Sequence, residues 1–243
     1  MEKITSRENA KIKYACRLAS SGAFRRSEGK FLAEGRKLCP ELCRGAALET
    51  LFCTEAALEK CPELAGLPGE HYLVEDHVAD KLADVGTHQG VFGVFRTPEH
   101  TLEEARTGGR YLALERVQDP GNVGTLLRSA AAFGFDGVIL SDGCASVWAP
   151  KTLRASMGAA VRIPVIEVGA MPDAIAQLLN EGKVQLFCAD SIDAESLLAG
   201  DTAPRRRAEM QEKYFGYLTA ELAPRIAALN APEAKKPPLI WCA

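Results

Sequence analysis

From residue 110 onward, short apolar stretches alternate with segments of helical periodicity, which leaves few architectures open to the chain. Strands are expected at the apolar stretches and helices between them, in the order strand 110–117, helix 123–133, strand 137–142, helix 151–160, strand 162–168, helix 172–181 and strand 184–190. Strands that are separated by helices join through right-handed crossovers into a parallel sheet. This part of the chain therefore predicts an α/β domain built on a parallel sheet.

The first 97 residues show a shorter alternation of the same kind. Ile4, Ile12 and Leu18 supply an apolar stripe that predicts a helix at residues 3–21. The following elements are expected to be a strand at 31–33, a helix around Pro40, a strand at 48–54, a helix at 55–64, a strand at 70–75, a helix at 76–84 and a strand at 89–97. The pattern predicts a small α/β domain ahead of the larger one.

A polar stretch separates the two alternations. Residues 97–110 contain a proline at their start and two glycines at their end, which is typical of a linker. We therefore predict a domain at 1–97, a linker at 98–109 and a second domain at 110–243.

Positive charge is concentrated at the start of the chain. The net charge is −3, but residues 1–37 hold ten Lys or Arg against four Asp or Glu, which is +6. A basic segment on an acidic protein suits RNA, because each neutralised phosphate releases counterions. The candidate RNA contacts are Arg25, Arg26, Lys30 and Arg36. A solvated basic helix explains the charge equally well.

Other classes of protein fit the sequence poorly. The eight cysteines form no Cys-x-x-Cys pair, which favours reduced thiols, and the four histidines lack the paired spacing of a zinc site, so no metal is expected. No run reaches the 18 or so apolar residues of a membrane span, and the charged N-terminus does not resemble a secretory signal. These features predict a cytoplasmic protein that does not enter a membrane.

The loop after the first strand of the second domain, DPGNVGTLLR at residues 119–128, is the leading candidate site. It lies where open α/β sheets bind ligands, and Asn122 is expected to cap the helix that follows. Its spacing matches neither the dinucleotide fingerprint nor the phosphate-binding loop. Arg128 falls off the apolar stripe of the helix, so it either binds an anion or is an ordinary exposed arginine.

The residues around this loop resemble the SpoU (TrmH-type) RNA methyltransferases. Asn122, Gly124 and Arg128 match the first motif, and PKTLRASMGAAVRIPV at residues 150–165 matches the second. The stretches FLAEGRKL and THQGVFGVF resemble the small substrate-binding domain that often precedes the catalytic one. The resemblance implies a knotted SPOUT fold, a homodimer, and transfer of a methyl group from S-adenosylmethionine to a ribose 2'-hydroxyl of rRNA or tRNA. It also implies that Arg128 helps to activate that hydroxyl, in a site that Asn122 shapes.

The second motif combines packing residues with residues that can meet RNA. Ser156 and Gly158 leave little side-chain bulk where another segment can pack closely. Lys151 and Arg154 are either RNA contacts or a solvated helix face. Trp148, in the preceding loop, either stacks on a base or anchors the loop.

The third motif of the family, a Gly-x-Glu-Gly turn followed by a Ser-Leu-Asn segment, is not found after residue 190. The segment AESLLAGDTA at 194–203 resembles it only superficially, with Leu198 at the asparagine position, and no cofactor-binding residues are assigned. Residues 204–243 instead predict a basic amphipathic helix with a proline-rich end, so residues 201–243 diverge from the family. This departure leaves an alternative function, an RNA-binding protein of the same family without methyl transfer.

Overall fold

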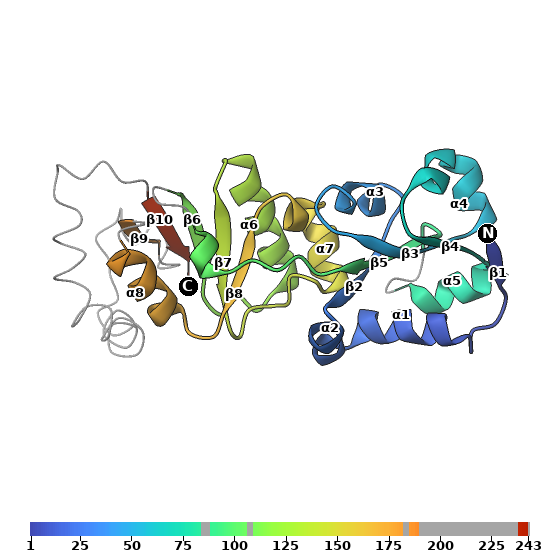
Figure 1. Cartoon of the computed structure of the whole chain (residues 1–243), viewed down its shortest axis with the longest axis horizontal. Coiled ribbons are helices and arrows are strands. Elements are labelled where there is room, and N and C mark those ends of the chain that lie inside the picture. Colours follow the sequence, from blue (N-terminus) through green and yellow to red (C-terminus); the bar gives the residue numbers. More distant parts are fainter. Residues whose placement is uncertain (84–87, 106–108, 182–184, 190–237, 243) are drawn as a thin grey trace, which may run out of the picture. The chain divides into compact units, whose positions relative to one another are not determined.

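The computed structural model describes residues 1–83, 88–105, 109–181, 185–189 and 238–242 (Figure 1). The chain divides into two compact units. Unit 1 consists of residues 1–99, 118–129 and 145–163, and unit 2 of residues 100–117, 130–144 and 164–243. Both candidate motifs therefore contribute residues to the same compact unit as the basic N-terminal segment.

Unit 1 contains a mixed five-stranded sheet with the strand order β1-β4-β3-β5-β2. Its strands are β1 (Glu2–Ile4), β2 (Lys30–Glu34), β3 (Leu48–Cys53), β4 (Glu70–Val74) and β5 (Val91–Arg96). The connecting helices are α1 (Ala10–Ser20), α2 (Gly22–Glu28), α3 (Leu38–Leu42), α4 (Glu55–Lys60), α5 (Asp76–Leu82) and the 3-10 turn η1 (Pro62–Gly66). β4 pairs in parallel with β1 and β3, whereas β5 is antiparallel to β3 and β2. The predicted small α/β fold is confirmed.

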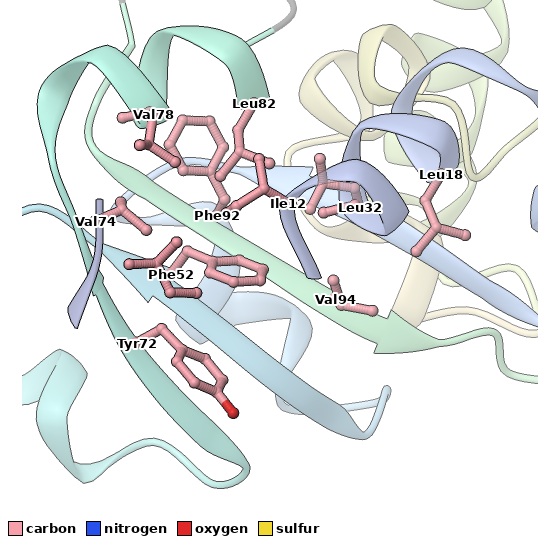
Figure 2. Packing of buried hydrophobic residues seen from close by; sticks show 13 residues of the cluster. Ile12, Leu18, Leu32, Phe52, Tyr72, Val74, Val78, Leu82, Phe92 and Val94 are labelled. Atoms are coloured by element: carbon pink, nitrogen blue, oxygen red, sulfur yellow. The ribbon is translucent and has the colours of Figure 1, made fainter. Parts of the chain in front are cut away.

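Apolar side chains from α1 and α5 cover one face of this sheet and form its core (Figure 2). Ile12 and Leu18 from α1 and Val78 and Leu82 from α5 are almost fully buried. They pack against sheet residues that include Leu32, Phe52, Phe92 and Val94. Each such side chain contributes about 1.5–3 kcal/mol when it is fully removed from water.

The first predicted helix, at residues 3–21, is wrong in its extent. Residues 2–4 form β1, where Ile4 is buried and pairs with Val74, so its apolar side chain belongs to a strand. The Asn9 side chain then accepts a hydrogen bond from the Lys11 amide and begins α1 at residue 10. Ser21 ends that helix and caps α2. Side-chain caps therefore divide the segment that periodicity alone predicts to be one helix.

Unit 2 contains a parallel five-stranded sheet with the order β8-β7-β6-β10-β9, which confirms the predicted parallel α/β fold. Its strands are β6 (Tyr111–Leu114), β7 (Gly137–Ser141), β8 (Val165–Val168), β9 (Gln185–Ala189) and β10 (Pro238–Cys242). The remaining elements of the chain, which are divided between the two units, are α6 (Pro120–Ala132), α7 (Pro150–Ser156), α8 (Met171–Asn180) and the 3-10 turns η2 (Leu102–Glu104) and η3 (Ala159–Val161).

Strand β10 lies between β6 and β9, although the sequence predicts no strand there (Figure 1). Ile240 pairs with Leu112 on one side and with Phe187 on the other. The segment is five residues long, begins with Pro238 and follows two lysines and Pro237, so it lacks the alternation that identifies a strand. Its pairing within the sheet corrects the prediction of a merely proline-rich end.

Candidate functional site

The glycine-rich loop begins α6 earlier than the sequence predicts. The helix starts at Pro120. Its first turn is bonded by the side chain of Asp119 and not by that of Asn122: the Asp119 carboxylate accepts a hydrogen bond from the backbone N–H of Asn122 at 2.9 Å. That bond, with a smaller contribution from Lys151 nearby, lowers the pKa of Asp119. Asn122 thus lies in the first turn with an exposed side chain, which leaves its amide group available to a ligand.

Gly124 is the point at which α6 meets α7. A Cβ atom at this position would lie 2.5 Å from Ala155 Cβ, 2.7 Å from the Thr152 carbonyl oxygen and 2.8 Å from the Ser156 nitrogen. Two of these three atoms belong to the backbone of α7, so they cannot move aside as a side chain would. The two motifs of the sequence therefore form one packed structure.

Replacing Gly124 with alanine is expected to destabilise the protein by about 1–3 kcal/mol, because the added methyl group overpacks this contact. Urea unfolding monitored by circular dichroism measures the change. Gly66 is the matched control, since a Cβ atom there meets nothing within 4 Å. Equal stability of the Gly124→Ala and Gly66→Ala variants would contradict the close packing of α6 on α7.

Arg128 lies on the exposed side of α6, as its position off the apolar stripe predicts. Val123 and Leu127 are fully buried, whereas the Arg128 guanidinium reaches the residue after α7 and donates from Nη1 to the Met157 sulfur at 3.1 Å. A thioether is a weak acceptor, so a phosphate or ribose oxygen would bind the guanidinium more strongly. Arg128 is therefore held in place by a partner that a ligand can displace.

Two residues in the left-handed backbone region end α7 at Ser156, earlier than the predicted helix at 151–160. Met157 has φ 50° and Gly158 has φ 85°. The side chain of Ser156 is fully buried and donates to the Leu153 carbonyl oxygen at 2.9 Å, so it has a packing role. The turn leaves Met157 62% exposed beside Arg128.

Gly158 allows α3 to approach this turn. A Cβ atom on Gly158 would lie 2.4 Å from Glu41 Cγ, and one on Gly45 would collide with the Val161 carbonyl oxygen. Glu41 also forms an ion pair with Arg162 at 3.6 Å and with Arg44 at 3.2 Å. The end of α3 is thus packed directly on the end of the second motif.

Trp148 anchors the loop before α7. Its ring is 7% exposed and stacks on Phe31 of β2, with centroids 4.9 Å apart, and Phe31 in turn stacks on Phe95. This burial favours the anchoring role over base stacking. It attaches the second motif to the N-terminal sheet.

The four candidate RNA contacts occupy different environments. Arg25 is buried and donates to the Leu18 and Ala19 carbonyl oxygens at 2.8 and 3.0 Å, so its guanidinium caps α1; burial lowers its pKa. Lys30 forms a 2.6 Å ion pair with Glu49. Arg26 is exposed, and Arg36 lines a pocket near the end of α7. The structure thus brings Arg36, but not the other three, to the second motif.

The carboxyl edge of the unit 2 sheet carries a polar group that the sequence analysis missed. Glu115 follows β6, and its Oε2 atom is buried without a hydrogen-bond partner among the described residues. Burial raises its pKa, and the positive charge of Arg116 opposes this effect. The signal available in the sequence was a carboxylate directly after a buried strand.

The remaining predictions concern the C-terminal segment, a metal site, a membrane span and the cysteines. The segment 194–203 and the predicted helix from residue 204 to residue 237 lie outside the described residues. Within the described ranges, no three His, Cys, Asp or Glu side chains are grouped to hold a metal ion, and no helix is long and apolar enough to cross a membrane. Six cysteines are free thiols, namely Cys16, Cys39, Cys43, Cys53, Cys61 and Cys144, and burial raises the pKa of Cys53 to about 12.

Comparisons with known proteins identify both parts of the chain. Residues 109–214 match the model of the SpoU rRNA methylase family, and residues 9–93 match an MRM3-like substrate-binding domain. The mitochondrial rRNA methyltransferase 3 of Xenopus tropicalis is 36% identical over 182 residues, which are 72% of this chain and 43% of that protein. The chain thus spans less than half the length of that relative.

A bacterial relative is covered more completely. The 23S rRNA (guanosine(2553)-2'-O)-methyltransferase of Bacillus subtilis (strain 168) is 33% identical over 184 residues, which are 75% of this chain and 71% of that protein. A solved structure of a putative RNA methyltransferase of the TrmH family from Porphyromonas gingivalis is 31% identical, with a TM-score of 0.64 over 76% of this chain and 72% of that one. The motifs, the parallel sheet and these likenesses agree: the chain belongs to the SpoU rRNA methylase family.

Proposed function

We propose that the protein transfers a methyl group from S-adenosylmethionine to a ribose 2'-hydroxyl of rRNA or tRNA. The observation that carries this proposal is Arg128, which is exposed at the junction of the two motifs and is held there by the Met157 sulfur. The activity for which the Bacillus subtilis relative is named, 2'-O-methylation of a guanosine in 23S rRNA, supports the same reaction.

Arg128 would act on the nucleophile. A ribose hydroxyl attacks poorly until its proton leaves, and a guanidinium remains cationic at every accessible pH. By donating to the 2'-oxygen or to an adjacent phosphate, Arg128 would stabilise the negative charge that develops as the hydroxyl proton passes to water. Asn122 would orient the same nucleotide through its exposed amide. S-Adenosylmethionine, when bound, supplies an electrophilic methyl group on a sulfonium.

The carboxyl edge of the unit 2 sheet fits a cofactor of this kind. Open parallel sheets bind ligands at this edge, and the Glu115 Oε2 atom, which has no hydrogen-bond partner in the described part of the chain, offers an acceptor for a cationic or hydroxyl-bearing group. We place the cofactor here and assign Glu115 to its polar contacts. The knotted part of the SPOUT fold stays a prediction.

We further propose that different parts of the chain have different functions. Residues 1–97 would bind the RNA substrate, 98–109 would link the domains, and 110–243 would carry methyl transfer, with 201–243 divergent. The family matches at residues 9–93 and 109–214 support this division. Homodimer formation and a cytoplasmic location are part of the same proposal, and light scattering and cell fractionation test them.

The deciding experiment incubates the purified chain with methyl-labelled S-adenosylmethionine and total RNA. We expect label in nucleosides that carry a 2'-O-methyl group, identified by mass spectrometry after nuclease digestion. Label on a base would overturn the reaction type. RNA binding without any label, together with no calorimetric binding of S-adenosylmethionine, would establish the alternative of an RNA-binding protein without methyl transfer.

A further inference from the structure

A pocket of about 870 Å³ lies in unit 1 between the turn after β2 and the end of α7. Its volume falls in the range of about 300–1,000 Å³ that is usual for small-molecule sites. Five basic residues and two acidic ones line it, a local excess of three positive charges: Arg36, Lys37, Arg44, Arg154 and Arg162 against Glu34 and Glu41. The pocket therefore suits an anion.

The walls of this pocket are fixed by close packing. The Gly158 and Gly45 contacts hold α3 against the end of α7, and the Trp148–Phe31 stack holds the loop before α7 against β2. The Arg36 amide donates to Gln89 Oε1 at 3.1 Å, which fixes the backbone of the turn after β2. A pocket with such walls loses little entropy when it binds a ligand.

The pocket adjoins the proposed catalytic arginine. Met157 is part of its lining, and the sulfur of the same residue accepts the hydrogen bond from Arg128. A ligand that fills the pocket therefore ends beside the Arg128 guanidinium. The apolar part of the lining, Leu38 and Met157, offers a surface for a flat base.

We propose that this pocket holds the nucleotide next to the methylated one in a single-stranded stretch of the RNA substrate. Arg36 and Lys37 would bind its phosphate, and Leu38 and Met157 would contact its base. This inference rests on the proposed function and adds to it a specific subsite. A single strand is implied because the pocket accepts one unstacked nucleotide, whereas a duplex keeps its bases stacked inside.

Two of the basic residues, Arg44 and Arg162, form ion pairs within the protein. Both pair with the Glu41 carboxylate, which balances one of their two positive charges. Arg36 is half-buried and Lys37 is exposed, and neither forms a salt bridge among the described ion pairs of this pocket. The two residues of the turn are therefore the phosphate contacts that a substitution tests most directly.

The test measures binding of a short, fluorescein-labelled, single-stranded RNA by anisotropy over a series of salt concentrations. Each of the Arg36→Ala and Lys37→Ala variants is expected to reduce the slope of log affinity against log salt by about 0.7, and the double variant by about 1.4. Lys60→Ala is the matched control: it removes one exposed positive charge outside the pocket and is expected to keep the wild-type slope.

Each other outcome has a defined meaning. Wild-type slopes in both pocket variants, with thermal unfolding unchanged, would overturn the subsite, as would tighter binding of a duplex than of the single strand. Absence of RNA binding by the wild-type chain would overturn it as well. The wild-type chain could bind RNA but transfer no methyl group, while the pocket variants reduce the salt slope. That result would support the subsite and overturn only the proposed activity.

Discussion

Replacing Arg128 with alanine is expected to lower the rate of ribose methylation by about 10²–10³-fold, the usual cost of removing one group that stabilises a developing oxyanion. The guanidinium is exposed and its one described contact is with a sulfur atom, so its loss costs the fold little. Single-turnover transfer of labelled methyl to RNA measures the rate. The effect should therefore appear in the chemical step and not in the stability of the protein.

The controls for Arg128 separate charge from geometry. Arg128→Lys keeps the positive charge but loses the planar fork, so partial activity is expected. Lys60→Ala, which alters an exposed residue of α4, should retain the wild-type rate. Full activity in Arg128→Ala would show that Arg128 does not act on the hydroxyl, whatever the family resemblance implies.

Replacing Trp148 with alanine is expected to destabilise the protein by about 3–5 kcal/mol, as for other buried aromatic side chains. Trp148 is 7% exposed, and removal of its ring leaves a cavity against Phe31. Urea unfolding measures the loss. Because this ring anchors the loop before α7, we also expect weaker RNA binding in the pocket that depends on it.

Phe133 is the matched control for Trp148. Its ring is 74% exposed, so Phe133→Ala should change the stability by no more than about 0.5 kcal/mol. A Trp148→Ala variant with wild-type stability and reduced RNA affinity would contradict the anchoring role. That result would favour base stacking as the role of Trp148.

Much of the fold followed from local patterns in the sequence. The buried stretches at β6 and β7 were recognisable because a fully buried parallel strand is a continuous apolar run. The errors arose where a local cap or a tertiary partner decided the outcome. Asn9 divided the first predicted helix, and β10 became a strand because β6 and β9 offered it two pairing partners.

The candidate site was predictable in its chemistry but not in its assembly. Helical periodicity separated an exposed Arg128 from the buried stripe, and the resemblance to the SpoU family selected Asn122 and Gly124 beside it. The partners of Gly124 and Arg128 lie 28 or more positions away in the chain, as Ala155 is from Gly124 and Met157 from Arg128. Periodicity carries no information about such contacts.

The sequence by itself determined the two α/β patterns, the family and the arginine proposed to act on the ribose. The tertiary structure decided which basic residues are available to RNA, because burial and ion pairing depend on neighbours that only folding supplies. Arg25 became a helix cap inside the protein, whereas Arg36, in the same basic segment, came to line the pocket beside Arg128. Charge can be counted along a chain, but the direction in which a charged side chain points is set by packing.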